Sequence, residues 1–396
     1  VLVIVVVMGL YDFVVGIFVG IGLAFISLVF QTSRIPAVRA SYSGKVVGST
    51  VRRSPAQHRY LMDVRVQIQV VKLGGYIFFG TISSVQKHIQ QITERDEFEQ
   101  RPIRFLVIDF YHVSGMDYSA AEAFCQINRI MSRKKIQIIM SGLNKCGDLR
   151  SSLEAVGVSE NGEVGMFEDM NSALESCESE LLKKFYSSSK SWSGEFFKPN
   201  YLDVLGHEEV DQKFMVDGHD RSKRARQLLQ VSEMPLDESS DEPEIVDVKE
   251  SLRLILHIFA PLTEKNERFW LRAVPFFEKK FFPANSVIFR RGAEANGFYL
   301  LQQGIMRAEY ELPQGHLREK ILAGTTCGEL NFFAEAKRTA TVTADRDCIA
   351  WLIDYKNWKN LQKKEPDVAQ ELMRIGLKIT SERMKSITSY VLTIAS

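Results

Sequence analysis

The residues with the clearest chemistry lie late in the chain, where Cys327-Gly328-Glu329-Leu330 is followed by Arg338-Thr339. A short helix that starts after Gly328 would offer unpaired backbone N–H groups to an anion. The guanidinium of Arg338 has a fixed charge and a forked set of donors, which suit two oxygens of a cyclic phosphate. Glu329 can accept a hydrogen bond from a ribose hydroxyl. The spacing therefore predicts a site for a cyclic nucleotide.

The elements that must position this site are short apolar segments separated by glycines. Strands are predicted at 287–289, 298–301, 306–312, 321–322 and 349–353, with glycines at 292, 304, 315 and 324. Short strands at regular spacing indicate a sandwich or barrel. The segments 252–258, 266–274 and 368–390 are predicted to be helices that flank it.

This region resembles the cyclic-nucleotide-binding family in the glycine turns of Val287-Ile-Phe-Arg-Arg-Gly292 and Gly297-Phe-Tyr-Leu-Leu-Gln-Gln-Gly304, and in the cassette above. The resemblance covers about 251–390 and implies a β-roll or jelly-roll with flanking helices. It implies a cyclic AMP or cyclic GMP ligand rather than a cofactor. It carries the binding role onto five residues: Gly328, Glu329, Leu330, Arg338 and Thr339.

One residue departs from the family pattern. Asn331 stands where the family usually has a small residue near the phosphate, so its side chain could crowd that ligand. The alternative is therefore a cassette that keeps the fold and binds nothing. In that case an ion pair between Arg338 and Glu329 could hold the empty site together.

Residues 61–186 alternate between strands and helices. Strands are predicted at 64–71, 73–79, 105–110 and 136–140, the second of them after a turn at Gly74-Gly75. Helices are predicted at 83–94, 117–131, 149–156 and 170–184. Such alternation predicts an α/β layer fold.

The run Val107-Ile-Asp109-Phe-Tyr-His-Val-Ser-Gly-Met116-Asp117-Tyr-Ser119 resembles the central motif of STAS domains. The preceding elements make residues 1 to about 186 similar to the C-terminal part of sulfate-permease (SulP) transporters, of a fungal, vacuolar-like type. The resemblance implies a scaffold and dimerisation module. It also places Ser119 where bacterial STAS proteins carry a phosphorylated serine. The alternative is that Asp117 or Ser119 only caps a helix.

The first 30 residues are apolar and contain one charge, Asp12. The uncharged run 13–30 has the length of a transmembrane helix, and 1–8 is expected to end a preceding span. A signal peptide would need basic residues before this run, not after it.

Six basic residues lie between this run and Asp63, which favours a cytosolic location for the segment and contact with lipid headgroups. These residues are Arg34, Arg39, Lys45, Arg52, Arg53 and Arg59. We expect a membrane domain to end at 1–30, a basic juxtamembrane segment at 31–60, and cytosolic residues thereafter.

Residues 187–250 have a different composition. They are rich in serine, contain a basic cluster at 221–226, and then hold eight acids against one lysine in 233–250. Such a segment cannot bury enough apolar surface to fold, so a disordered tether is predicted. Ser239 and Ser240 precede acids and are candidate phosphorylation sites. An unmodified, solvated linker is the alternative.

Composition excludes several classes of function. A net charge of +1 gives no general argument for nucleic acid binding. The five cysteines have no CxxC spacing, so neither disulfides nor a metal site is predicted. No set of residues has the arrangement of a catalytic centre, and we expect no enzyme activity.

The sequence therefore predicts a multidomain chain: the C-terminal end of an α-helical membrane domain at 1–30, an α/β STAS domain at 61–186, a linker at 187–250 and a cyclic-nucleotide-binding-like domain at 251–396. By resemblance it is the regulatory C-terminal region of a secondary transporter for sulfate or another anion. The expected partners are membrane lipid, its own upstream transmembrane domain, a second copy and a cyclic nucleotide. A vacuolar or other internal membrane is favoured over the plasma membrane. The alternative is a membrane-tethered signalling protein without transport activity.

Overall fold

The computed structural model describes residues 13–33, 36–93, 102–143, 147–158, 164–189, 243–312 and 315–395. The chain forms two compact units, and each is described by itself. Unit 1 comprises Val1–Ser49, Val64–Glu178 and Leu392–Ser396, and unit 2 comprises Thr50–Asp63 and Ser179–Val391. The 50–63 segment thus belongs to unit 2, although most of it was assigned from sequence to a juxtamembrane segment before the first domain.

The apolar N-terminal run forms helix α2 (Phe13–Ser33), as the sequence indicates. Within the described parts of the chain, however, no helix combines the length and the apolar character that crossing a membrane requires, so the predicted span is not shown.

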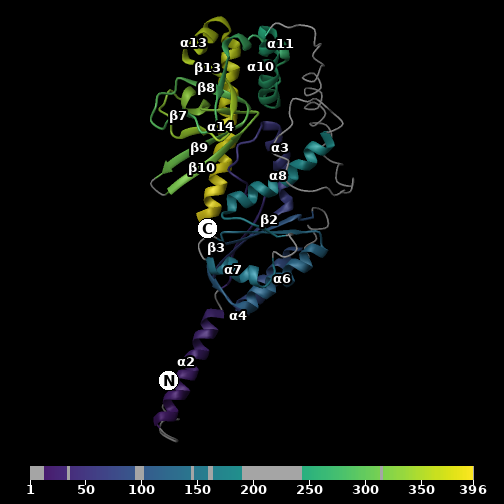
Figure 1. Ribbon diagram of the computed structural model, residues 1–396, viewed down its shortest axis with the longest axis vertical. Helices are drawn as coiled ribbons and strands as arrows, with labels where there is room; N and C mark the ends of the chain where they lie inside the picture. Colours follow the sequence, from purple (N-terminus) through teal and green to yellow (C-terminus); the bar gives the residue numbers. More distant parts are fainter. Residues whose placement is uncertain are drawn as a thin grey trace. The chain divides into compact units, whose positions relative to one another are not determined.

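Unit 1 is built on a five-stranded sheet with the strand order β1-β2-β3-β4-β5. The strands are β1 (Val38–Ser43), β2 (Ile68–Ile77), β3 (Phe105–Met116), β4 (Gln137–Ser141) and β5 (Gly165–Met166). β1 is antiparallel to β2, and the other neighbours are parallel. Helices α4 (Phe79–Thr93), α6 (Tyr118–Arg133) and α7 (Gly147–Ala155) share one apolar core with the sheet (Figure 1). Helix α8 (Met170–Ser189) follows β5. This confirms the α/β layer prediction.

Two strands predicted at 64–71 and 73–79 are one strand, β2, which begins only after helix α3 (Pro55–Val64) and a short 3-10 turn. Gly74 and Gly75 do not turn the chain. The pairing with β3 shifts register at these glycines, and Gly75 has a φ of 75°. The pair therefore forms an irregularity inside the strand, where a Cβ on Gly74 would lie 2.5 Å from Cδ of Arg39.

Unit 2 contains two four-stranded antiparallel sheets, with the orders β10-β9-β12-β7 and β11-β8-β13-β6. The strands are β6 (Glu278–Phe282), β7 (Val287–Phe289), β8 (Gly297–Gln303), β9 (Ile305–Leu312), β10 (Gly315–Leu322), β11 (Thr325–Cys327), β12 (Thr341–Ala344) and β13 (Cys348–Asp354). One apolar cluster includes side chains of both sheets, among them Leu301, Met306, Val342 and Ala350. The predicted β-roll is confirmed.

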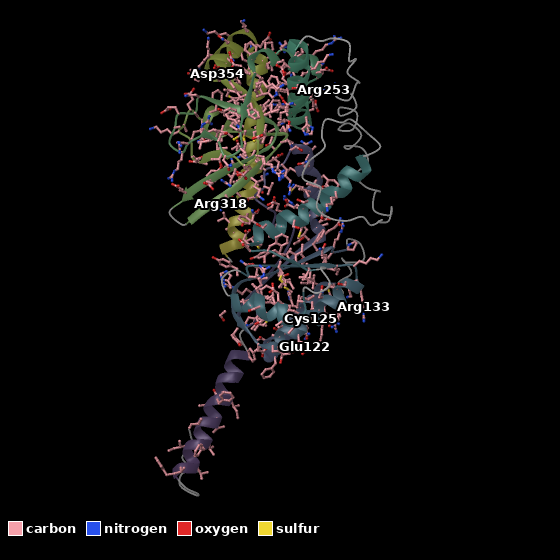
Figure 2. All side chains as sticks on the ribbon, viewed as in Figure 1. Glu122, Cys125, Arg133, Arg253, Arg318 and Asp354 are labelled. Atoms are coloured by element: carbon pink, nitrogen blue, oxygen red, sulfur yellow. The ribbon has the colours of Figure 1, made fainter. Side chains whose placement is uncertain are left out.

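Helices α10 (Pro243–Phe259), α11 (Glu267–Leu271), α13 (Tyr355–Lys364) and α14 (Pro366–Ala395) flank this β-roll. Asp354 caps α13 by accepting a hydrogen bond from the amide of Asn357 at 2.7 Å (Figure 2). α10 starts inside the segment predicted to be a tether. Its acids Asp247 and Glu250 bind the ammonium of Lys279 on β6 at 2.8 and 2.7 Å, so the end of the acidic run is helical and contacts the β-roll.

Candidate ligand site in the β-roll

The predicted cassette begins at Gly328, which joins β11 to the short helix α12 (Glu329–Phe333). Gly328 has a φ of 84°, a left-handed conformation that glycine adopts without steric cost. A Cβ there would lie 2.5 Å from Nη1 of Arg338. Glycine is therefore required both by the backbone and by the closeness of the arginine.

The guanidinium of Arg338 is buried and is bound to the protein backbone. Nη1 donates to the carbonyl of Gly328 at 2.8 Å and Nη2 to the carbonyl of Gly297 at 2.5 Å. The guanidinium also lies 4.2 Å from the ring centroid of Phe289. Burial lowers the pKa of Arg338, with Cys327 nearby opposing the shift. In this structure Arg338 fastens the cassette to the β-roll, and its Nε has no hydrogen-bond partner among the described residues.

Asn331, the residue that departs from the family pattern, bridges the two ends of the cassette. Its Nδ2 donates to the carbonyl of Lys337 at 2.9 Å, and its Oδ1 accepts a hydrogen bond from the hydroxyl of Thr339 at 3.4 Å. The side chain thus occupies the Thr339 hydroxyl, which a ligand oxygen would otherwise contact. Leu330 is 40% exposed on α12.

Glu329 is 1% exposed, and neither of its carboxylate oxygens has a hydrogen-bond partner among the described residues. Its charge is balanced by Arg52, whose Nη1 lies 3.5 Å from Oε1. The ion pair with Arg338 that the sequence suggested for an empty cassette is therefore replaced, because Arg338 is turned toward backbone carbonyls. The acceptor capacity of Glu329 remains available for a hydroxyl donor.

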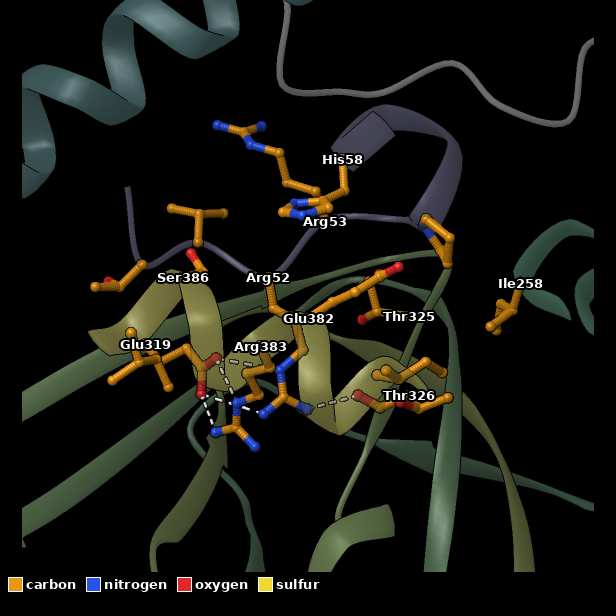
Figure 3. Close-up of a pocket in the computed structure, with 15 residues that line it drawn as sticks. Arg52, Arg53, His58, Ile258, Glu319, Thr325, Thr326, Glu382, Arg383 and Ser386 are labelled. Carbon is orange, nitrogen blue, oxygen red and sulfur yellow. Dashed lines mark hydrogen bonds and ion pairs between the residues drawn. The ribbon is translucent and has the colours of Figure 1, made fainter. Parts of the chain in front are cut away.

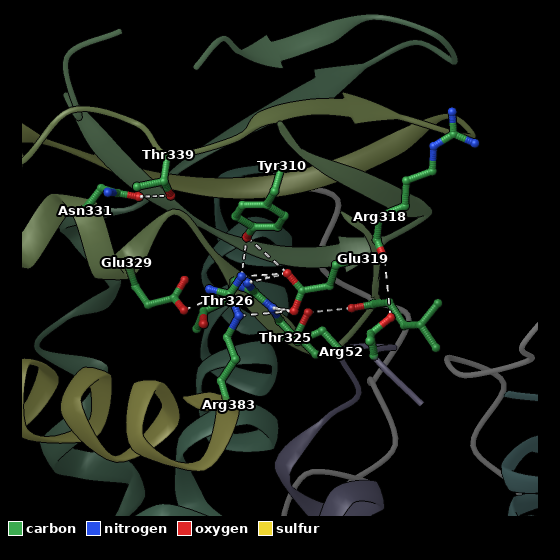
Figure 4. A network of polar contacts seen from close by, with 12 residues as sticks. Arg52, Tyr310, Arg318, Glu319, Thr325, Thr326, Glu329, Asn331, Thr339 and Arg383 are labelled. Atoms are coloured by element: carbon green, nitrogen blue, oxygen red, sulfur yellow. Dashed lines mark hydrogen bonds and ion pairs between the residues drawn. The ribbon is translucent and has the colours of Figure 1, made fainter. Parts of the chain in front are cut away.

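Arg52 reaches Glu329 from the 50–63 segment and is bound on several sides (Figure 4). Nε and Nη2 donate to the two carboxylate oxygens of Glu319, each at 3.2 Å, and Nη1 donates to the carbonyl of Thr326 at 2.9 Å. Only 10% of the Arg52 side chain is exposed. The sequence-based expectation that this arginine contacts lipid headgroups does not fit this burial.

Glu319 is shared between two arginines. Arg383 of α14 donates to it from Nε at 3.1 Å and from Nη2 at 2.6 Å, and Nη2 also contacts the hydroxyl of Tyr310. The Tyr310 hydroxyl lies 3.2 Å from Oε2 of Glu319. Burial alone would raise the pKa of Glu319, but Arg52 and Arg383 outweigh burial and lower it. Glu319 therefore stays ionised inside the β-roll.

A cavity of about 70 Å³ lies next to this network (Figure 3). It is lined by the 50–58 segment, by β10 and β11, by the end of α10, and by α14 from Ile379 to Ile387. Most ligand pockets have roughly 300–1,000 Å³. This cavity beside Arg52 and α14 is therefore far smaller than a nucleotide site.

The predicted site of unit 1 has a different character. Asp117 caps α6 by accepting from the amide of Ala120 at 2.7 Å, and its Oδ2 also accepts from the amide of Phe79 at 3.1 Å. Ser119 is exposed on the first turn of α6, and its phosphorylation stays a prediction.

The other predicted phosphorylation sites, Ser239 and Ser240, lie outside the described residues. Among the described residues, no group of His, Cys, Asp and Glu is placed to hold a metal ion.

Sequence reasoning missed four members of the network: Arg52, Tyr310, Glu319 and Arg383. A signal existed for Glu319, because it lies two residues from the apolar Leu317 and two from the apolar Ile321 along β10, so the three side chains share one face of the strand. No local pattern marks Arg52, whose partner Glu319 lies 267 residues further along the chain.

Comparisons with known proteins match a different family in each of the two units. Residues 60–173 match the STAS domain family, and residues 279–365 match the cyclic nucleotide-binding domain family. Over its full length the chain is 28% identical to the "Vacuolar basic amino acid transporter VSB1" of Saccharomyces cerevisiae and covers 42% of that protein.

Two further similarities cover parts of the chain. "Sulfate transporter 1.3" of Arabidopsis thaliana is 23% identical over 133 residues, which are 32% of this chain and 20% of that protein. A crystal structure of a cyclic nucleotide-binding domain from Methylobacillus flagellatus has 15% identity and a TM-score of 0.34, over 37% of this chain and 83% of that one. The chain spans less than half the length of these curated relatives. It carries a STAS domain and a cyclic nucleotide-binding domain, and it is distantly similar to membrane transporters.

Proposed function

We propose that this chain is the C-terminal regulatory region of a secondary membrane transporter. The observation that carries the proposal is the similarity to a named transporter over the whole chain, STAS and nucleotide-type domains included. The chain covers 42% of that relative, so the transport pathway would lie in a part of the protein beyond these residues. The proposal includes no chemical step catalysed by this chain.

The relatives suggest different substrates. The relative that matches the whole chain is named for basic amino acids, whereas the sulfate transporter matches 32% of it. We therefore place basic amino acids ahead of sulfate or another anion as the transported substrate. The same relative favours the vacuolar membrane, with the chain on its cytosolic side. The STAS domain would act as a scaffold and dimerisation module within that membrane protein.

The nucleotide-type domain would be the sensor of this transporter. Its cassette keeps Gly328, Glu329 and Arg338, and the buried carboxylate of Glu329 has free acceptor capacity that a ribose hydroxyl could fill. Cyclic AMP or cyclic GMP is the ligand class that this chemistry fits. Binding would shift the packing of the domain and so bias the transport cycle.

The test is uptake by the complete protein reconstituted into lipid vesicles. We expect uptake of radiolabelled arginine and lysine, little uptake of sulfate, and a rate that changes when cyclic AMP or cyclic GMP is added on the side of the regulatory domains. Uptake of sulfate alone would restore the anion assignment. A folded, inserted protein that moves none of these substrates would reject transport and favour the membrane-tethered signalling protein.

A further inference from the structure

Arg52 is held in the β-roll as a ligand would be held. Its side chain has five N–H donors in a fixed fork. Two of its nitrogens are bound to Glu319, and the third donates to Thr326 and faces Glu329. Both carboxylates are nearly inaccessible to solvent, with 3% exposure for Glu319 and 1% for Glu329. A buried carboxylate pair with a carbonyl between its members is a site for a guanidinium group.

The backbone around Arg52 also joins the β-roll. The amide of Arg52 donates to the carbonyl of Lys320 at 2.7 Å, and the amide of Leu322 donates to the carbonyl of Arg52 at 3.0 Å. This single parallel bridge pairs Arg52 with Ile321 of β10, the edge strand of its sheet. The hydroxyl of Thr50 donates to the carbonyl of Arg318 at 3.3 Å. The segment is thus fixed by main-chain bonds as well as by its arginine.

Charge explains why an internal cation is needed. Glu319 and Glu329 bring two negative charges into the β-roll, and Arg383 supplies one positive charge from α14. Arg52 supplies the second, next to both carboxylates, whereas the guanidinium of Arg338 is bound to backbone carbonyls. Burial opposes the charged form of Arg52, but Glu319 and Glu329 outweigh it and raise its pKa. Without Arg52, the buried carboxylate of Glu329 would lose its ion pair, which is strongly unfavourable.

Position explains why Arg52 excludes a nucleotide. Nη1 of Arg52 lies 3.5 Å from Oε1 of Glu329, the carboxylate that would accept from a ribose hydroxyl. A hydroxyl within hydrogen-bond distance of that oxygen would have to share the space with the guanidinium.

We propose that residues 50–54 are a built-in ligand of the nucleotide-type domain, with Arg52 occupying the ribose side of the pocket. A cyclic nucleotide and this segment then exclude each other, so each weakens the binding of the other by the same factor. These residues begin the 50–63 segment, which is joined covalently to unit 1 at Ser49 and at Val64. Ligand binding would therefore detach residues 50–54 from the β-roll. These residues lie in the segment that connects two parts of the STAS unit. This inference rests on the proposed sensor function.

The first experiment titrates a fluorescent cyclic AMP into the purified 396-residue chain, in the wild-type form and as Arg52→Ala. The matched control is Arg59→Ala, because Arg59 lies in the same segment and is exposed. Arg52→Gln serves as a second variant that keeps the length of the side chain and loses the charge. We expect at least tenfold tighter binding by both Arg52 variants and no change for Arg59→Ala. Equal affinity in the wild type and in both variants would overturn the built-in ligand and leave the sensor function standing.

A second readout does not depend on nucleotide binding. Guanidinium chloride at low millimolar concentration, compared with sodium chloride at equal ionic strength, should raise the melting temperature of Arg52→Ala and not that of the wild type. Rescue without any nucleotide binding would retain the guanidinium site and reject cyclic nucleotides as its ligand. Absence of rescue together with absence of a nucleotide effect would overturn the inference.

Discussion

Both units contain a buried glutamate paired with an arginine, but the two glutamates are satisfied differently. In unit 1, Glu178 accepts from the amide and the hydroxyl of Ser49 at 2.9 and 2.5 Å and lies 2.8 Å from Nη2 of Arg65. In unit 2, Glu329 has no hydrogen bond among the described residues, and its ion pair with Arg52 spans 3.5 Å. The first acid is held entirely by the chain, as a structural residue would be. The carboxylate of Glu329 has acceptor capacity that no hydrogen bond uses among the described residues, which is expected of a residue that binds a ligand.

The largest effect is expected for Glu178→Ala. Removing this carboxylate breaks the buried ion pair with Arg65, a residue that is 5% exposed. Breaking one side of a buried pair typically costs ~3–5 kcal/mol of folding free energy. Urea unfolding followed by circular dichroism should show this loss. Glu154→Ala is the control, because its pair with Arg150 is about half exposed and should contribute at most ~0.5 kcal/mol. A loss below ~1 kcal/mol for Glu178→Ala would remove the contrast between the units.

A smaller loss is expected for Glu319→Gln, which keeps the shape of the side chain and removes its charge. Hydrogen bonds to charged groups contribute about 1.5–3 kcal/mol each, and the amide retains one acceptor. We therefore expect a loss of about 2–3 kcal/mol in the same unfolding measurement. No loss would mean that Arg52 and Arg383 are held by other contacts.

The same residue gives unit 2 a pH dependence. The folded pKa of Glu319 lies below its ordinary value of 4.5, because Arg52 and Arg383 outweigh burial. Its contribution to stability is therefore complete above pH 4.5 and is lost as the pH falls through the lower, folded pKa. Melting temperatures between pH 7 and pH 3 should fall more steeply for the wild type than for Glu319→Gln. Parallel curves would contradict this role.

Gly328→Ala tests the start of the cassette. An alanine would have to adopt a φ of 84° with its Cβ 2.5 Å from Nη1 of Arg338. Such strain typically costs about 1–3 kcal/mol, and displacement of a flexible arginine keeps this change at the lower end. The unfolding midpoint of unit 2 should fall, and Gly22→Ala, which meets nothing within 4 Å, should not lower it. An unchanged midpoint would show that the cassette can rearrange freely.

The smallest effect is expected for Asn331→Ala. The loss of the bond to the Lys337 carbonyl should cost about 1 kcal/mol, because this part of α12 is partly exposed. The hydroxyl of Thr339 is released by the same change, so nucleotide affinity should rise in an Arg52→Ala background. Affinity that falls instead would mean that Asn331 supports the ligand rather than crowding it.

The comparison also shows what the sequence could reveal. Period-two and apolar runs predicted β3, α6 and the β-roll, because these elements follow from local patterns. The glycine pair at 74–75 misled the strand prediction, since a bulge and a turn share the same residue type. Arg52 could not be assigned, because six similar basic residues precede Asp63 and only the tertiary fold selects the one that reaches Glu329.

The most direct test of the account is a double-mutant cycle between Arg52 and Glu329. The unfolding free energies of Arg52→Ala, Glu329→Gln and the double variant are compared with that of the wild-type chain. If the two side chains form a pair, the double variant should lose less than the sum of the single losses, with a coupling of about 1–3 kcal/mol. Additivity within about 0.5 kcal/mol would show that Arg52 is not the partner of Glu329 and would contradict the built-in ligand.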